Sequence, residues 1–280
     1  MNTLKTALLS LINIFFRKLT IEKIYANLYT SHHNIYVRII SKRYSFWYRS
    51  VDFDDLNMMC RENLKFWESK SREIFSILSL SSNTVFDIGS YTGVYALVAA
   101  KSNKKLKVSA FEPNPDLFSA LEKNLKLNRI RNVKSEQMAL DNQPGEAYLY
   151  LNHDIHTSIG SLIQSSTAGK KVLVRKTTLD IYCENHSVNS IDLIKIDVEG
   201  YETNVLQGGS SIIKKSSPII LMESLTQQTL EKQFELLSEL GYLRPLQVNG
   251  DGFDLNNWLW FTETHRDKVK QISHLLINKF

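Results

Sequence analysis

Three acidic residues lie within six positions at the point where a predicted strand meets a predicted helix. Asp197, Glu199 and Glu202 follow one another at the end of the apolar run 191–198. A carboxylate at such a rim could accept the proton of a substrate hydroxyl. Because side chains alternate along a strand, Lys195 shares a face with Asp197 and is expected to pair with it or to hold it ionised.

Other roles remain open for the same acids. Glu199 and Glu202 could be ordinary helix-start residues, favoured by the helix dipole. Glu223, which ends the predicted strand 218–223, could join the same rim or form an ion pair at the sheet edge. Hard oxygen ligands of this kind could also hold Mg²⁺, although we expect no required metal. His156, on a loop that could cover an acceptor, is a further candidate base or an exposed loop histidine.

A glycine motif precedes the predicted helix 94–101. The chain reads Asp87-Ile88-Gly89-Ser90-Tyr91-Thr92-Gly93, so that its glycines would let the backbone approach a ligand beside a helix N-terminus. A dinucleotide fingerprint requires glycine where Tyr91 stands, which disfavours NAD.

A second acid, Glu112, ends the next predicted strand, 25 residues after Asp87. Its two oxygens could accept hydrogen bonds from ribose hydroxyls, and its charge would repel a 2′-phosphate. The acidic start, the glycine loop and the ribose-binding acid together suit a nucleoside with a positive centre and an amino-acid tail. This pattern predicts S-adenosylmethionine as the cofactor.

The elements that must position these residues alternate between short apolar strands and amphipathic helices. This order predicts an α/β fold with a doubly wound, mostly parallel sheet of about seven strands. We expect two parts: a basic, aromatic, helical N-terminal extension at 1–80 and an α/β domain at 81–280. The predicted strands are 84–88, 107–111, 133–140, 147–151, 172–175, 191–198, 218–223, 242–248 and 258–263, and the predicted helices are 54–79, 94–101, 116–128, 201–206, 227–240 and 265–280.

The charge is unevenly distributed. The chain of 280 residues has a net charge of +5, but residues 1–50 alone hold eight basic side chains and one acidic one. The rest of the chain, residues 51–280, is therefore near neutral, which disfavours nucleic acid as a partner. The apolar run 7–16 is shorter than the roughly 20 residues of a spanning helix, and Arg17-Lys18 follows where a signal peptide would need small residues. Residues 1–50 are either packed on the domain or in peripheral contact with the inner face of the membrane. Two distant cysteines, Cys60 and Cys183, exclude a cysteine zinc site and fit a cytoplasmic location.

Four segments resemble the FkbM family of S-adenosylmethionine-dependent methyltransferases: 85–100, 110–128, 138–147 and 177–209. The resemblance covers roughly residues 82–225 and implies a class I methyltransferase, Rossmann-like fold and methyl transfer to a hydroxyl oxygen. It also implies that Asp87, Gly89 and Gly93 line the methionine end of the cofactor and that Glu112 binds the ribose. The segment Ala139-Leu140-Asp141 would lie near the adenine. Ser90-Tyr91 departs from the family's usual Ala-Asn.

Members of this family modify natural products and bacterial glycans. We therefore expect an O-methyltransferase whose acceptor is a small molecule or a glycan hydroxyl, such as a sugar of a cell-surface or lipid-linked glycan. The alternative is a non-catalytic glycan- or membrane-binding module that keeps the fold. Deletion of residues 1–50 is expected to leave cofactor binding intact and to change acceptor use or membrane association. The oligomeric state stays open.

Overall fold

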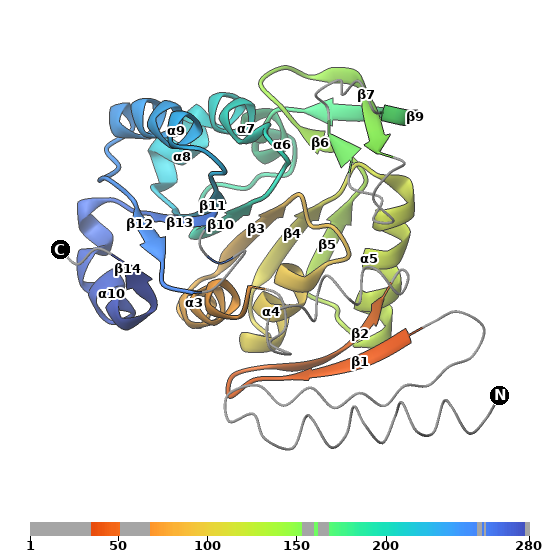
Figure 1. Ribbon diagram of the computed structural model, residues 1–280, viewed down its shortest axis with the longest axis horizontal. Coiled ribbons are helices and arrows are strands. Elements are labelled where there is room, and N and C mark those ends of the chain that lie inside the picture. The colour runs from red at the N-terminus through yellow and green to blue at the C-terminus, as the bar shows by residue number, and fades with distance from the viewer. Residues whose placement is uncertain are drawn as a thin grey trace.

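The largest sheet of the protein has eight strands. The computed structural model describes residues 35–50, 68–152, 160–161, 168–250, 254 and 256–277 (Figure 1). The strands of this sheet are β3 (Thr84–Ile88), β4 (Lys107–Phe111), β5 (Val133–Glu136), β10 (Leu193–Ile196), β11 (Ile219–Glu223), β12 (Leu246–Val248), β13 (Asn257–Trp260) and β14 (Leu276–Ile277). They are arranged in the order β14-β12-β13-β11-β10-β3-β4-β5.

The sheet confirms the expected doubly wound, class I methyltransferase arrangement. The neighbouring strands β11, β10, β3, β4 and β5 are parallel. Strands β13 and β12 form the predicted antiparallel addition at the edge. The expected count of about seven is exceeded by β14. The predicted closing helix 265–280 is wrong in its second half, because α10 (Arg266–Lys270) is short and the chain then pairs with β12. Leu275 and Leu276 are thereby buried, and the edge of β12 is covered.

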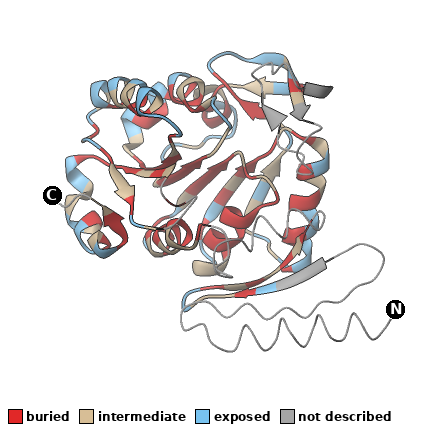
Figure 2. Ribbon diagram, in the orientation of Figure 1, coloured by how far each residue is buried: buried red, intermediate tan, exposed pale blue. Residues whose placement is uncertain are grey.

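Helices cover both faces of this sheet (Figure 1). The alternation of β11 explains why, since Ile219 and Leu221 join one hydrophobic cluster while Ile220 and Met222 join the other. Figure 2 shows the central strands almost entirely buried between the two layers. One face carries α3 (Ser69–Ser79), α4 (Val94–Ser102) and α5 (Pro115–Leu127), and the other carries α6 (Leu179–Asn185), α7 (Glu202–Gly208), α8 (Ser210–Ser216) and α9 (Gln227–Glu239).

A smaller sheet lies beside the main one. It contains β6 (Ala139–Leu140), β7 (Gly145–Asn152), β8 (Gly160–Ser161) and β9 (Ala168–Thr177), in the order β6-β9-β7-β8. The predicted strand 133–140 is therefore divided between two sheets, because the chain turns at Met138, whose N–H bonds to the Glu136 carbonyl at 3.0 Å. Because the chain leaves the main sheet after β5 and continues as β6, Ala139 lies at the edge of the cavity described below.

The N-terminal extension is not wholly helical. Its described part begins with an antiparallel hairpin, β1 (Ile35–Ile40) and β2 (Ser45–Ser50), which lies along α5 in Figure 1. In β2, buried and half-buried residues alternate, which is the period of a strand. The helix expected at 54–79 is confirmed for α3, while residues 51–67 lie outside the described part.

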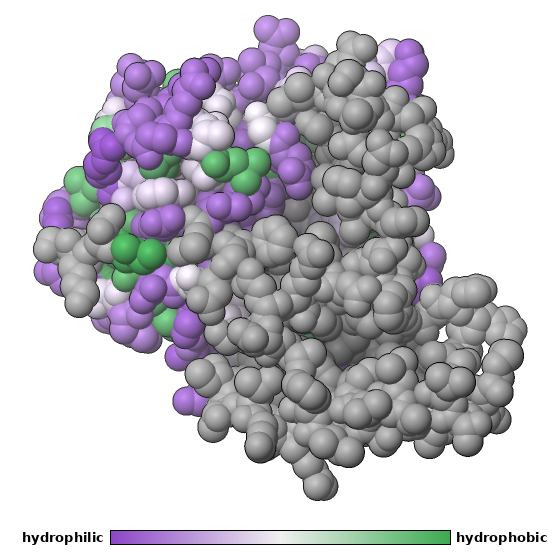
Figure 3. All heavy atoms as spheres, in the orientation of Figure 1, coloured by the Kyte–Doolittle hydropathy of each residue, from purple (hydrophilic) through white to green (hydrophobic). Residues whose placement is uncertain are grey.

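The described surface gives few apolar features. In the view of Figure 3 it is mostly hydrophilic, with separate hydrophobic spots. None of the described helices combines the length and the apolarity needed to cross a bilayer. The apolar run 7–16, on which the peripheral membrane alternative depends, lies outside the described residues.

Candidate active site

A cavity of about 330 Å³ opens at the carboxyl ends of the central parallel strands. This is the edge of a doubly wound sheet at which ligands bind. Five carboxylate side chains line it, together with a single lysine, Lys195. The five acids come from four separate places in the chain, since two of them follow β10: Glu68, Glu112, Asp197, Glu199 and Glu223.

Gly89 forms the turn that joins β3 to this cavity. Its φ is +79°, and a Cβ there would lie 1.8 Å from the carbonyl oxygen of Asp197. Glycine is therefore required for the close approach of this turn to the end of β10. Gly93 has a φ of +90°, and a Cβ there would lie 2.3 Å from Cδ1 of Leu121 on α5. Gly89 lies on the cavity wall, whereas Gly93, which was also expected to line the cofactor, does not. Both glycines allow a neighbouring part of the protein to approach closely.

Asp87 lies beneath the cavity and not on its wall. Its side chain is buried, and Oδ2 accepts a hydrogen bond of 2.9 Å from the Ala96 N–H in the first turn of α4. Burial raises the pKa of Asp87 to about 7, although Lys195 and the Ala96 N–H oppose this shift. Asp87 therefore positions the glycine loop and α4 from below.

Glu112 is on the wall and fixes the loop from the opposite side. Its Oε2 accepts a hydrogen bond of 2.9 Å from the Tyr91 N–H, and its Oε1 accepts one of 2.9 Å from the Asn114 N–H. Burial raises the pKa of Glu112 to about 8, against the effect of these two bonds. A carboxylate has about four lone-pair sites, so both oxygens can still accept a bond from a ligand hydroxyl.

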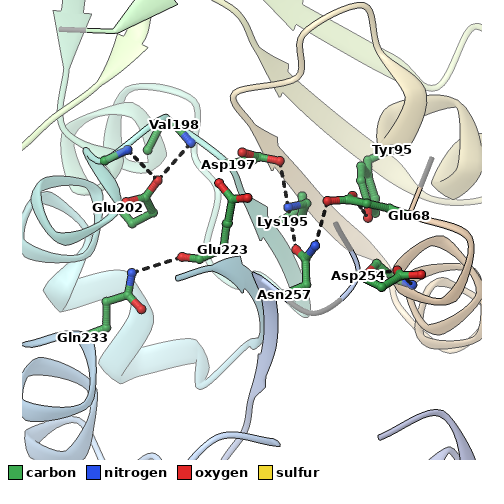
Figure 4. Close-up of polar contacts among 12 residues, drawn as sticks. Glu68, Tyr95, Lys195, Asp197, Val198, Glu202, Glu223, Gln233, Asp254 and Asn257 are labelled. Atoms are coloured by element: carbon green, nitrogen blue, oxygen red, sulfur yellow. Dashed lines mark hydrogen bonds and ion pairs between the residues drawn. The ribbon is translucent and has the colours of Figure 1, made fainter. Parts of the chain in front are cut away.

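A chain of four polar side chains joins two residues of the cavity wall, Asp197 and Glu68 (Figure 4). Lys195 Nζ donates to Asp197 Oδ2 at 3.0 Å, which confirms the pairing expected from strand alternation. The same ammonium donates to Asn257 Oδ1 at 3.0 Å, and Asn257 Nδ2 donates to Glu68 Oε1 at 2.7 Å. Tyr95, also on the cavity wall, extends this chain, since its hydroxyl donates to Glu68 Oε2 at 2.5 Å.

Burial and charge act in opposite directions in this chain. Burial alone would lower the pKa of Lys195, but Asp197 and Glu68 raise it above its usual value. Burial raises the pKa of Glu68 to about 7, while Lys195 opposes the rise. The Lys195 ammonium also lies 5.1 Å from the centre of the Tyr95 ring. The lysine is thus the only basic side chain among the described residues of the wall, and it is already paired.

Sequence reasoning missed Glu68 and Asn257. Glu68 precedes α3, and Asn257 begins β13, so 189 positions separate the two in the chain. Neither residue stands in a motif, and no local signal indicates that they meet. Only the packing of α3 against α4 and the pairing of β13 with β11 bring them to Lys195.

The three remaining acids of the rim differ in position. Glu199 lies on the wall, and burial, followed by repulsion from Asp197, raises its pKa to about 7. Glu223 also lies on the wall, and the same two causes raise its pKa to about 9. Glu202 is buried away from the wall, and its Oε1 accepts from the N–H groups of Gly200 and Val198 at 3.0 and 3.3 Å (Figure 4). Its geometry matches the helix-start interpretation.

In the segment Ala139-Leu140-Asp141, which was expected near the adenine, only some of the residues line the cavity. Ala139 lies on the wall, but Asp141 does not. The Asp141 carboxylate accepts from Lys176 Nζ at 2.6 Å and from Asn204 Nδ2 at 2.9 Å. These bonds lower the pKa of Asp141 even though burial is the largest single influence and raises it. Asp141 therefore joins the small sheet to α7.

The candidate base His156, on the loop expected to cover the acceptor, lies outside the described residues. Across the described part of the chain, no three histidine, cysteine, aspartate or glutamate side chains are grouped as a metal site requires.

Known proteins are similar to this chain in sequence. The family model of the methyltransferase FkbM domain matches residues 87–247. The 2-O-methyltransferase NoeI of Sinorhizobium fredii is 27% identical over 192 residues, which cover 63% of this chain and 77% of NoeI. Methyltransferase 1 of Beauveria bassiana is 27% identical over 144 residues, 44% of this chain and 57% of that protein.

Two further proteins are similar over a smaller share of their length. The hexuronic acid methyltransferase AglP of Haloferax volcanii is 26% identical over 151 residues, 50% of this chain and 55% of AglP. The chain thus spans little more than half of AglP and of the Beauveria protein. The crystal structure of methyltransferase FkbM from Methylobacillus flagellatus superposes with a TM-score of 0.46 at 15% identity, over 65% of this chain and 44% of that one. Because the family model covers more than half of the chain, the expected resemblance is confirmed, and this protein belongs to the methyltransferase FkbM domain family.

Proposed function

We propose that this protein is an S-adenosylmethionine-dependent O-methyltransferase. The observation that carries the proposal is the cavity at the ends of β3 and β4, where the Gly89 turn and the Glu112 carboxylate meet. S-adenosylmethionine, when bound, supplies a methyl group activated by a positively charged sulfur. The chain itself supplies binding, orientation and a proton acceptor.

The donor set of the cavity fits that cofactor. Five carboxyl groups against one paired lysine favour a ligand with positive charge, such as a sulfonium and an ammonium group, because a cation nearby would lower their raised pKa values and hold them ionised. Glu112 has lone pairs left for the two ribose hydroxyls. Met138, Ala139 and Leu140 offer an apolar side for a purine ring.

Glu199 is our candidate for the group that accepts the proton of the acceptor hydroxyl. It lies on the wall, and its pKa of about 7 suits a base that works near neutral pH. Asp197, fixed by Lys195, would orient the hydroxyl or the cofactor's ammonium group. Glu202 would act as a positioning residue, because it holds the N–H groups on both sides of Glu199. His156 remains a further candidate on the expected loop over the acceptor.

The acceptor we propose is a hydroxyl of a sugar in a cell-surface or lipid-linked glycan. This is supported by the names of two relatives, a 2-O-methyltransferase and a hexuronic acid methyltransferase. The basic, aromatic segment 1–50 supports a place for the enzyme on the cytoplasmic side of a membrane, in peripheral contact with its anionic surface.

Calorimetric titration with S-adenosylmethionine tests the cofactor. We expect the wild-type protein to bind and Glu112→Gln to bind at least about tenfold more weakly, because a Gln amide would set a donor against one of the two N–H groups that Glu112 accepts. Glu122→Gln is the matched control, since Glu122 is exposed on α5. Absence of binding by the wild-type protein would contradict the proposal.

Transfer of labelled methyl groups to glycan and lipid fractions tests the reaction. We expect label in an alkali-stable ether on a sugar hydroxyl. Tight binding of the cofactor without transfer to any fraction would instead favour a non-catalytic module that has kept the fold.

A further inference from the structure

The N-terminal hairpin is hydrogen-bonded to the glycine loop of the cavity. The hydroxyls of Tyr48 on β2 and Thr92 in the loop share a hydrogen bond of 2.7 Å, and both side chains are fully buried. The carbonyl of Thr92 accepts a second bond, of 3.0 Å, from Asn124 Nδ2 on α5. Thr92 is thus held through its side chain and its main chain, and it immediately precedes Gly93, the N-cap residue of α4.

Asn124 and Asn128 bind the hairpin as if they were a neighbouring strand. Asn124 Oδ1 accepts from the Arg49 N–H at 2.7 Å, and its Nδ2 donates to the Arg49 carbonyl at 3.3 Å. Asn128 does the same for Trp47, accepting from its N–H at 2.7 Å and donating to its carbonyl at 2.5 Å. Two carboxamides one helical turn apart therefore satisfy the outer edge of β2.

The loop between Ser90 and Gly93 needs to be held in place. Tyr91 and Gly93 have φ angles of 51° and 90°, so two of its four residues are in the left-handed region. A non-glycine residue in this region is conformationally costly and persists when its surroundings constrain it. Glu112 constrains the loop from the cavity side through Tyr91, and the Tyr48 and Asn124 bonds constrain it from the opposite side.

We propose that the β1–β2 hairpin is a part of the cofactor site, and that Tyr48 and Asn124 are positioning residues that hold the loop 90–93 in its cofactor-binding shape. The hairpin lies outside the family match, which begins at residue 87. Neither Tyr48 nor Asn124 lines the cavity, so both would act through Thr92. This inference rests on the proposed cofactor, and it opposes the expectation that loss of residues 1–50 leaves cofactor binding intact.

Removal of one hydroxyl tests the inference without removing packing volume. Tyr48→Phe and Thr92→Val each delete one partner of the shared bond and keep the shape of the side chain. We expect each to raise the Kd for S-adenosylmethionine about fivefold. The double variant should be no weaker than the weaker single variant, because all three lack the same bond.

Tyr44→Phe is the matched control. Tyr44 is a buried tyrosine next to β2, and its hydroxyl accepts a bond of 3.2 Å from Arg72 Nη1, away from the loop. We expect this variant to lose thermal stability to a similar extent and to keep the Kd within about twofold of wild type. A merely structural role for Tyr48 predicts equal losses of Tm in both variants and an unchanged Kd in both, and this result would overturn the inference.

Hydrogen exchange of the ligand-free protein separates this inference from the proposed function. We expect the amides of Tyr91, Thr92 and Gly93 to exchange faster in Tyr48→Phe than in wild type and Tyr44→Phe. Faster exchange supports the positioning role even if the wild-type protein fails to bind S-adenosylmethionine, in which case the cofactor assignment alone fails. Unchanged exchange in Tyr48→Phe would overturn the positioning role.

Discussion

Lys195 and Asp197 form an ion pair of 3.0 Å in which the lysine side chain is 1% exposed and the aspartate side chain is 18% exposed. Both residues line the cavity, but the positive charge is almost completely enclosed while the carboxylate of its partner is partly exposed. Asn257 and Tyr95 enclose the ammonium further. Such a pair directs one carboxylate toward a ligand and keeps it in a single place.

Loss of this lysine should be costly. Lys195→Met keeps most of the volume but leaves Asp197 and Glu68 without their cation, so we expect it to lower the free energy of unfolding by about 3–5 kcal/mol. Arg244→Met is the control, because the Arg244–Glu231 pair has a similar distance, 2.6 Å, but is exposed. The control should cost less than about 1 kcal/mol. Urea denaturation measures both, and equal small losses would show that the buried pair contributes little.

The Gly89 turn should tolerate no side chain. In Gly89→Ala the new Cβ would collide with the carbonyl of Asp197, in addition to the strain of a φ of +79°. In Gly241→Ala the φ is a similar +89°, and nothing lies within 4 Å of the new Cβ. We expect a loss of about 1–2 kcal/mol in the control and a larger loss in Gly89→Ala, together with the loss of S-adenosylmethionine binding. Similar stability and binding in the two variants would disprove the steric requirement.

The proton acceptor should be visible in the dependence of the rate on pH. Burial raises the pKa of Glu199 to about 7, so kcat/KM should increase with pH through this value as the carboxylate form appears. Glu199→Gln should remove this limb and lower kcat/KM by about 10²–10⁴-fold. Glu122→Gln, on the surface, should keep the wild-type profile. An unchanged limb in Glu199→Gln would assign the titration to another group.

The free protein should become less stable as the pH rises. The pKa values of Asp87 and Glu112 are raised by burial to about 7 and 8, whereas in an unfolded chain these groups ionise near pH 4. Between these limits the folded protein binds more protons than the unfolded chain, so the free energy of unfolding falls with increasing pH. Urea denaturation at about pH 5, 6.5 and 8 measures the trend.

Asp87→Asn provides the comparison for this trend. An amide cannot ionise, so the variant should lose part of the slope between about pH 5 and 8. A free energy of unfolding that rises with pH in the wild-type protein would contradict the raised pKa values.

Local sequence was sufficient for the parallel core. The apolar runs that predict β3 and β4 have the bounds that the structure gives them, because a buried strand needs several consecutive apolar residues. The pairing of Lys195 with Asp197 follows from strand alternation alone. The short helices α6 and α8 were not predicted, whereas α7, which is also seven residues long, was predicted at 201–206.

The roles of the individual acids in the site could not be predicted from local sequence. Asp87, Glu112, Asp141 and Glu202 are all acids next to strands or helix starts, yet only Glu112 of these four lies on the cavity wall. What separates them is the partner that each carboxylate meets, and that partner comes from another element. Asn124 stands in none of the motifs that predict the site, but its side chain holds β2 and Thr92.

The sequence by itself determined the type of sheet, the glycine turn and the family, since each depends on residues close together in the chain. Tertiary structure decided which acids face the cavity and that Glu68, Asn257 and the N-terminal hairpin belong to its surroundings. The physical reason is that a hydrogen bond of about 3 Å between distant segments depends on how whole elements pack, and their packing leaves no local pattern of residue types.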